Sequence, residues 1–140
     1  MDNAAGILGL AKKAGKLEIG EESVSTAVRQ SRARLIMSAA DASANSRSHA
    51  EHLADTGGTV MIVLPYGKDE LGALLGRGSP GIMALTDLGM ALSFTEKLEA
   101  AHPEEYGDAV AALRKKKARR DERQTAGRTA GNPAKRRTNK

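Results

Sequence analysis

Two periods of apolar residues alternate along roughly the first 100 positions of the chain. Apolar residues three and four apart predict helices at residues 4–14, 21–31, 44–55 and 86–100, with a shorter helix at 69–75. Short alternating or continuous apolar runs predict strands at 16–19, 33–39, 59–64 and 82–85. Helices that alternate with strands indicate an α/β fold in one domain.

Glycines and polar residues mark the ends of these elements. Gly15 is placed to end the first helix, and Gly57 and Gly58 are placed to end the third. Ser43 or Asp41 can cap the helix that begins near residue 44, and Thr86 or Asp87 can cap the helix at 86–100. The strand at 16–19 is short and alternating, which is typical of an edge strand, whereas the strand at 33–39 is apolar enough to be covered on both faces.

The C-terminal part of the chain has a different character. A helix is predicted from residue 104 to about 123, with an acidic start and a strongly basic end. From Thr125 onward small, polar and basic residues cannot bury enough apolar surface to order the chain. We therefore expect an α/β domain at 1–100, a basic C-terminal helix at 101–124 and a disordered basic tail at 125–140.

Composition narrows the possible functions. Aromatic residues make up 2% of the 140 residues, which argues against recognition of single strands by base stacking. The absence of cysteine excludes disulfides, cysteine nucleophiles and thiolate metal sites. No apolar run approaches the ~20 residues of a membrane helix, and the N-terminal run, broken by Lys12 and Lys13, does not resemble a signal peptide. We expect a soluble, cytoplasmic protein with no membrane partner.

Charge is divided between the two parts of the chain. Residues 114–140 hold 12 Lys/Arg and 2 Asp/Glu, a net charge of +10, whereas the remaining 10 Lys/Arg and 15 Asp/Glu give residues 1–113 a net charge of −5. The clusters at 114–117, 119–120 and 135–137 are dense enough to bind a phosphate backbone without reading sequence. A solubilising extension that meets RNA weakly is an equally open interpretation.

The segment from Gly15 to Asp41 carries the main candidate site. Gly20 stands between a strand end and a helix start, an arrangement that directs free backbone N–H groups and the positive end of the helix dipole at one point. Such a point suits a phosphate group. Six of the ten basic residues of the body lie in this segment or just before it: Lys12, Lys13, Lys16, Arg29, Arg32 and Arg34.

Catalytic and cofactor motifs are not found. His49 and His52 share a helix face, but without a further ligand such a pair is expected to be a solvated face rather than a metal site. The glycines at 76 and 78 are followed by Pro80, where a dinucleotide-binding helix would have to begin. No phosphate-cradling nucleotide loop and no triad can be argued. We expect no enzyme activity, no cofactor and no metal.

Five segments, in order, resemble a known family. I-L-G-L-A-K-K-A-G-K, I-G-E-E-S-V, A-R-L-I-M-S-A-A-D-A-S-A-N, K-D-E-L-G-A-L-L-G and I-M-A-L-T-D-L-G-M-A are similar to segments of the bacterial YlxQ-like proteins. These belong to the kink-turn-binding ribosomal protein superfamily of the L-seven-Ae and L-thirty-e type. The resemblance covers roughly residues 5–98. It implies a three-layer α/β/α sandwich with a mixed four-stranded sheet, no catalysis, and binding to bent, internally looped RNA.

The resemblance also implies a set of RNA-binding positions. In that superfamily the helix after the first strand carries G-x-N-E-x-x-K at the RNA. The glycine matches Gly20, while Glu22, Ser23 and Thr26 stand at the Asn, Glu and Lys positions. Arg29 or Lys16 could supply the missing charge. With the glycine-rich loop before the last strand, the candidate RNA-binding residues are Lys16, Gly20, Glu21, Glu22, Ser23, Thr26, Arg29, Arg77, Gly78 and Ser79.

Two functions of different class follow. In the first, a monomeric, non-catalytic protein binds structured RNA, ribosomal or similar, with the ribosome as a candidate partner in translation. In the second, the acidic body docks a protein partner and the basic tail alone meets nucleic acid.

Overall fold

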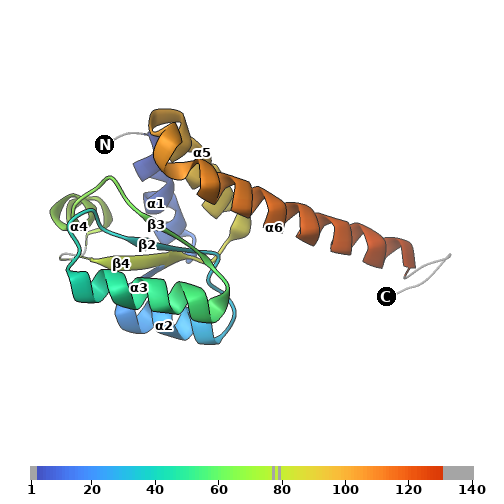
Figure 1. Ribbon diagram of the computed structural model, residues 1–140, viewed down its shortest axis with the longest axis horizontal. Coiled ribbons are helices and arrows are strands. Elements are labelled where there is room, and N and C mark those ends of the chain that lie inside the picture. Colours follow the sequence, from blue (N-terminus) through green and yellow to red (C-terminus); the bar gives the residue numbers. More distant parts are fainter. Residues whose placement is uncertain (1–2, 77, 79, 131–140) are drawn as a thin grey trace.

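Helices and strands follow one another in the order that the apolar pattern predicts (Figure 1). The computed structural model describes residues 3–76, 78 and 80–130, with side chains up to residue 125. The helices are α1 (Asn3–Lys13), α2 (Glu21–Arg29), α3 (Ala44–Gly57), α4 (Lys68–Leu75), α5 (Leu88–Ala101) and α6 (Pro103–Ala130). The strands are β1 (Leu17–Ile19), β2 (Leu35–Ser38), β3 (Val60–Val63) and β4 (Ile82–Leu85).

The four strands form one mixed sheet in the order β1-β4-β2-β3. Strand β4 runs antiparallel to both of its neighbours, so that Leu85 lies opposite Leu17 on one side and opposite Leu35 on the other. Strands β2 and β3 run parallel. The predicted α/β fold with a mixed four-stranded sheet is therefore confirmed, and β1 is an edge strand as expected.

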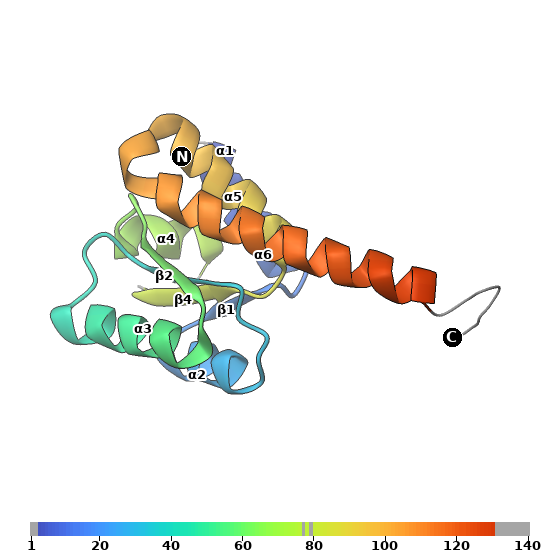
Figure 2. The same cartoon turned by 45° about the vertical axis from the view of Figure 1, so that its right-hand side comes forward.

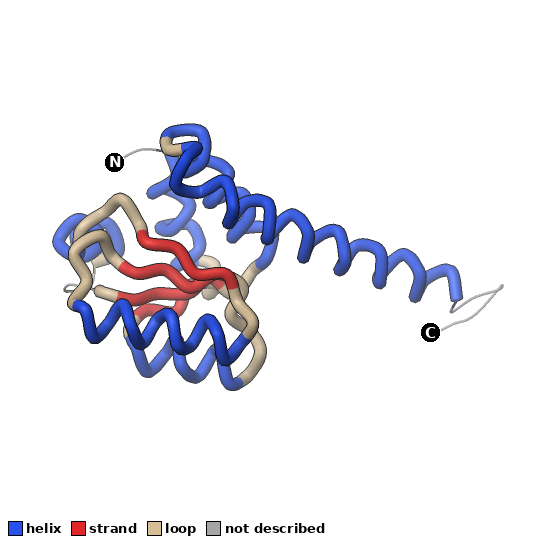
Figure 3. Tube along the Cα trace, viewed as in Figure 1, coloured by secondary structure: helices blue, strands red, loops and turns tan. Residues whose placement is uncertain are grey.

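Helices cover both faces of the sheet and make a three-layer α/β/α sandwich (Figures 2 and 3). The alternation of side chains along β2 sends Leu35 and Met37 into the core under α1, α4, α5 and α6, and Ile36 into the core under α2 and α3. All four residues of β2 are buried. This explains why the strand reads as an apolar run.

The first half of α6 belongs to the larger of these two cores. Tyr106, Ala109, Val110 and Leu113 are buried there, at the spacing of one helix face that packs on α5. The helix then runs outward from the core and continues past the predicted end at 124 to Ala130 (Figure 1). Residues 131–140 of the predicted disordered tail lie outside the described residues, and the division of the chain into domains stays a prediction.

Three cap positions follow from short polar side chains. Ser43 Oγ accepts a hydrogen bond from Ser46 N at 3.1 Å and caps α3, and Asp87 Oδ1 accepts from Met90 N at 2.9 Å and caps α5. Asp41, the alternative cap for α3, instead accepts from Lys68 N at 2.8 Å, at the start of α4. The sequence could not choose between Ser43 and Asp41 because the acceptor for α4 comes from a distant part of the chain.

A hydrogen bond from Tyr106 connects α6 to strand β3. Its hydroxyl donates to the Val63 carbonyl at 2.7 Å, and burial, followed by the charge of Glu105, raises the pKa of Tyr106 to about 12. Replacement Tyr106→Phe leaves that carbonyl unsatisfied, and we expect a loss of about 1 kcal/mol in the free energy of unfolding at pH 7, measured by urea denaturation.

The hydrogen bond between Tyr106 and Val63 should make stability depend on pH. Because the pKa of Tyr106 is higher folded than unfolded, its contribution is complete below about pH 10 and is lost as pH rises toward 12. The stability difference between the parent protein and Tyr106→Phe should therefore shrink over that interval. A difference that stays constant from pH 7 to 12 would contradict the role given to this hydroxyl.

Candidate RNA interface

Gly20 joins β1 to α2 through a backbone conformation that other residues rarely adopt. Its φ is 97° and its ψ is 157°. Its N–H donates to the Ile82 carbonyl at 3.0 Å, which holds the start of α2 against the first residue of β4. The positive φ explains why a glycine is required at this junction.

Among the described residues, no capping side chain accepts a hydrogen bond from the first N–H groups of α2. In this it differs from α3 and α5, which are capped by Ser43 and Asp87, and from α4, whose first N–H reaches Asp41. The first N–H groups of a helix have no partner inside the helix and carry the positive end of its dipole. The start of α2 is thus available to an anionic or carbonyl acceptor from outside.

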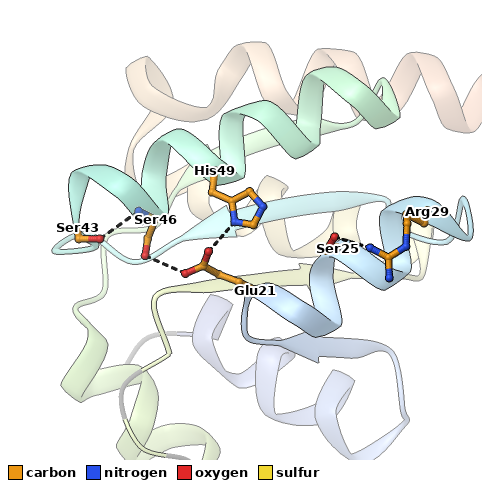
Figure 4. A network of polar contacts seen from close by, with 6 residues as sticks. All are labelled: Glu21, Ser25, Arg29, Ser43, Ser46 and His49. Carbon is orange, nitrogen blue, oxygen red and sulfur yellow. Dashed lines mark hydrogen bonds and ion pairs between the residues drawn. The ribbon is translucent and has the colours of Figure 1, made fainter.

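Glu21, in the first turn of α2, is engaged by α3 (Figure 4). One carboxylate oxygen lies 2.5 Å from His49 Nδ1, and the other accepts from Ser46 Oγ at 3.3 Å. The side chain of His49 keeps 38% of its surface exposed, in agreement with a solvated helix face, and it makes this contact as well. Glu21 and His49 stand 28 positions apart, so their contact leaves no mark in local sequence.

Arg29 folds back along α2 toward its N-terminus (Figure 4). Its guanidinium donates to Ser25 Oγ at 2.9 Å and to Thr26 Oγ1 at 3.1 Å. Long side chains of a helix lean toward the preceding turn, so this geometry is the natural one. A positive charge is thereby placed over Thr26, one turn closer to Gly20 than the Arg29 backbone.

The last residue of the glycine-rich loop before β4, Gly81, lies near the start of α2. Gly81 accepts a hydrogen bond from Ala39 N at 2.9 Å, and the next residue, Ile82, is bonded to Gly20. A Cβ built on Gly81 would lie 3.9 Å from Ser46 Oγ, the hydroxyl that contacts Glu21. Gly78 is exposed. Arg77 and Ser79 lie outside the described residues.

The structure therefore brings most of the predicted site together but separates Lys16 from it. Gly20, Glu21, Glu22 and Ser23 surround the helix start, with Thr26 and Arg29 following along α2. Lys16 is at the opposite end of β1, where its carbonyl accepts from Thr86 N at 2.9 Å. The strand between them makes this separation about 10 Å or more.

The basic residues of this segment do not form a single surface around Gly20. Lys12 donates to the Leu75 carbonyl at the end of α4, and Arg32 pairs with Glu18 at 3.3 Å. Arg34 lies at the far end of β4, where its N–H donates to the Leu85 carbonyl at 2.8 Å. Within the described residues, Arg29 is the one basic residue of these six that contacts a motif position of α2, namely Thr26.

Within the described residues, no three potential His, Cys, Asp or Glu ligands gather into a group that could hold a metal ion. None of the helices described is both long enough and apolar enough to cross a membrane.

Comparison with known proteins identifies the family. Residues 2–89 match the model of the ribosomal protein L7Ae/L30e/S12e/Gadd45 family, and the chain belongs to this family. The match spans β1, α2 and the loop before β4. Membership suggests an RNA-binding protein of the ribosomal type.

Solved structures agree on the fold. A protein of unknown function from Bacillus halodurans superimposes with a TM-score of 0.63 and 22% sequence identity, over 69% of this chain and 96% of that one. At this identity the likeness concerns the fold alone. A search of curated proteins finds no match.

The junction at Gly20 can be tested by stability. The Cβ added by Gly20→Ala would have no atom within 4 Å, so the substitution is costly only because of the backbone conformation. We expect the free energy of unfolding, measured by thermal or urea denaturation, to fall by about 1–3 kcal/mol.

Gly9 is the matched control. It lies inside α1, and a Cβ there also meets nothing within 4 Å, but no positive φ is present. Gly9→Ala should therefore stabilise the protein by about 0.5–1 kcal/mol. Equal effects of the two substitutions would refute the constraint assigned to Gly20.

Proposed function

We propose that this protein is a non-catalytic RNA-binding protein that holds bent, internally looped RNA of the kink-turn type at the start of α2. The observation that carries the proposal is the uncapped N-terminus of α2, held by Gly20 beside the loop that precedes β4. Membership of a ribosomal protein family supports RNA as the ligand. We propose further that the protein works in the cytoplasm, where it binds ribosomal RNA or the ribosome and serves translation. In this it would resemble the YlxQ-like proteins and act as a monomer.

A phosphate group fits the helix start for two reasons. The N–H groups of the first turn supply hydrogen bonds, and the helix dipole supplies a favourable field. The carboxylate of Glu21, which would repel a phosphate, is turned to His49 and Ser46. The exposed Glu22 is suited to a base amino group rather than to the backbone.

Arg29 replaces the charge that Thr26 lacks. The family motif places a lysine at the position of Thr26, and the guanidinium of Arg29 lies 3.1 Å from the Thr26 hydroxyl. A guanidinium offers a planar set of donors to a phosphate, where an ammonium offers a point charge. The interface thus keeps a cation at this position although the sequence motif has changed.

Arg29→Gln tests the proposal. The substitution removes the charge but keeps donors, and we expect about 10-fold weaker binding of the full-length protein to a kink-turn RNA, measured by fluorescence anisotropy. Lys97→Gln, an exposed lysine of α5, removes the same charge elsewhere and should change the affinity little. If the parent protein binds the kink-turn and an unbent duplex of equal length with the same affinity, recognition of bent RNA is refuted.

A protein-interaction module is the second candidate, favoured by the net charge of −5 on residues 1–113. Deletion of residues 114–140 distinguishes this candidate from the RNA-binding proposal. Leu113 is the last buried residue of α6 among the described side chains, so the deletion leaves the core intact.

Under the RNA-binding proposal, the deletion variant still prefers kink-turn RNA to an unbent duplex, although its overall affinity is lower. Complete loss of RNA binding, with a purified protein partner still retained, would favour the interaction module. The two ligands are compared by anisotropy at fixed salt, because backbone binding depends strongly on ionic strength.

A further inference from the structure

A basic cleft lies where α6 leaves the body, at the end of the sheet opposite Gly20. It has a volume of about 440 Å³ and is bounded by α6, by the turn that follows α3 and by the segments before β2 and after β4. Figure 2 shows α6 passing over this end of the sheet. The cations that line the cleft are Arg34, Lys116, Arg119, Arg120 and Arg123.

Three of these cations are close enough to oppose one another's charge. Burial, followed by the charges of Arg34 and Arg119, lowers the pKa of Lys116. The Lys116 ammonium is fixed by donation to the Gly58 carbonyl at 2.6 Å. A Cβ at Gly58 would meet no atom within 4 Å, so the glycine leaves open space at this wall. The cleft thus holds like charges together, which is unfavourable until an anion is present.

Few carboxylates offset these charges. Asp87 lines the cleft, but its Oδ1 is used to cap α5. Asp121 lies 3.0 Å from Lys117 and 3.4 Å from Arg120. The Nε of Arg120 is buried without a hydrogen-bond partner within the described residues. A donor of this kind normally finds an acceptor.

We propose that this cleft is a second RNA-binding site, which takes the phosphate backbone of a strand and reads no base. The basic row from Lys116 to Arg123 extends about 10 Å along α6, given a rise of 1.5 Å per residue. That length exceeds a single phosphate and matches about three successive phosphates of one strand. The choice of RNA as the polyanion rests on the proposed function, whereas the phosphate chemistry of the cleft does not.

The cleft and the α2 interface contact different parts of the RNA. Gly20 is bonded to Ile82 at one end of β4, whereas Arg34 is bonded to Leu85 at the other. The length of the strand sets the two sites about 10 Å or more apart. A protein with both sites holds an RNA bend at one end of the sheet and an adjoining helical arm at the other.

The test uses an unbent RNA duplex of 20 base pairs, which does not depend on recognition at α2. In the full-length protein, Arg34→Glu with Arg119→Glu changes two exposed side chains of the cleft. We expect about 10-fold or more weaker binding at 100 mM salt, and a slope of log affinity against log salt that is smaller by about two. Circular dichroism and thermal unfolding establish that the variant is folded.

The matched control is Lys97→Glu with Lys115→Glu, which changes the net charge equally at exposed positions outside the cleft. It should lose clearly less affinity and keep the salt slope of the parent. Equal losses in the two double variants would mean that only net charge matters, and would overturn the second site.

The result is independent of the α2 interface. If the parent protein prefers the kink-turn RNA but the double substitution in the cleft does not weaken duplex binding more than its control does, the second site alone is rejected. A cleft effect without kink-turn preference rejects the proposed recognition of bent RNA and keeps the backbone site.

Discussion

Strand β4 determines how the start of α2 and the basic cleft are arranged. It is completely buried and pairs antiparallel with β1 and with β2 at once. Its first residue accepts a hydrogen bond from Gly20, and its last accepts one from Arg34. The register of four residues therefore decides which polar groups lie at each end of the sheet. A slip by one residue would also turn the buried side chains to the wrong face.

The geometry of the helix start at Gly20 is set by the backbone. The positive φ of Gly20, its bond to Ile82 and the absence of a capping side chain are properties of the backbone. They do not require the residues found at the family's Asn, Glu and Lys positions. The guanidinium of Arg29 lies against the Thr26 hydroxyl, and the carboxylate of Glu21 contacts His49. Each of these contacts is made with a neighbour in space.

Helix α6 carries both part of the apolar core and the basic residues that line the cleft. Its first half packs on α5 and is fixed to β3 through the Tyr106 hydroxyl, while the residues after Leu113 carry the basic surface. The apolar half thus sets the direction in which the cations point. This is why Lys116, Arg119 and Arg123 face Arg34, although about eighty positions or more separate them in sequence.

Local pattern in the sequence was enough to predict the order of helices and strands, the buried nature of β2 and the glycine junction before α2. Each of these depends on residues a few positions apart, through apolar period and backbone preference. Three features were decided by tertiary structure: the separation of Lys16 from Gly20, the engagement of Glu21 by His49, and the convergence of Arg34 with α6. They depend on strand pairing and helix packing between distant segments, which local periodicity does not encode.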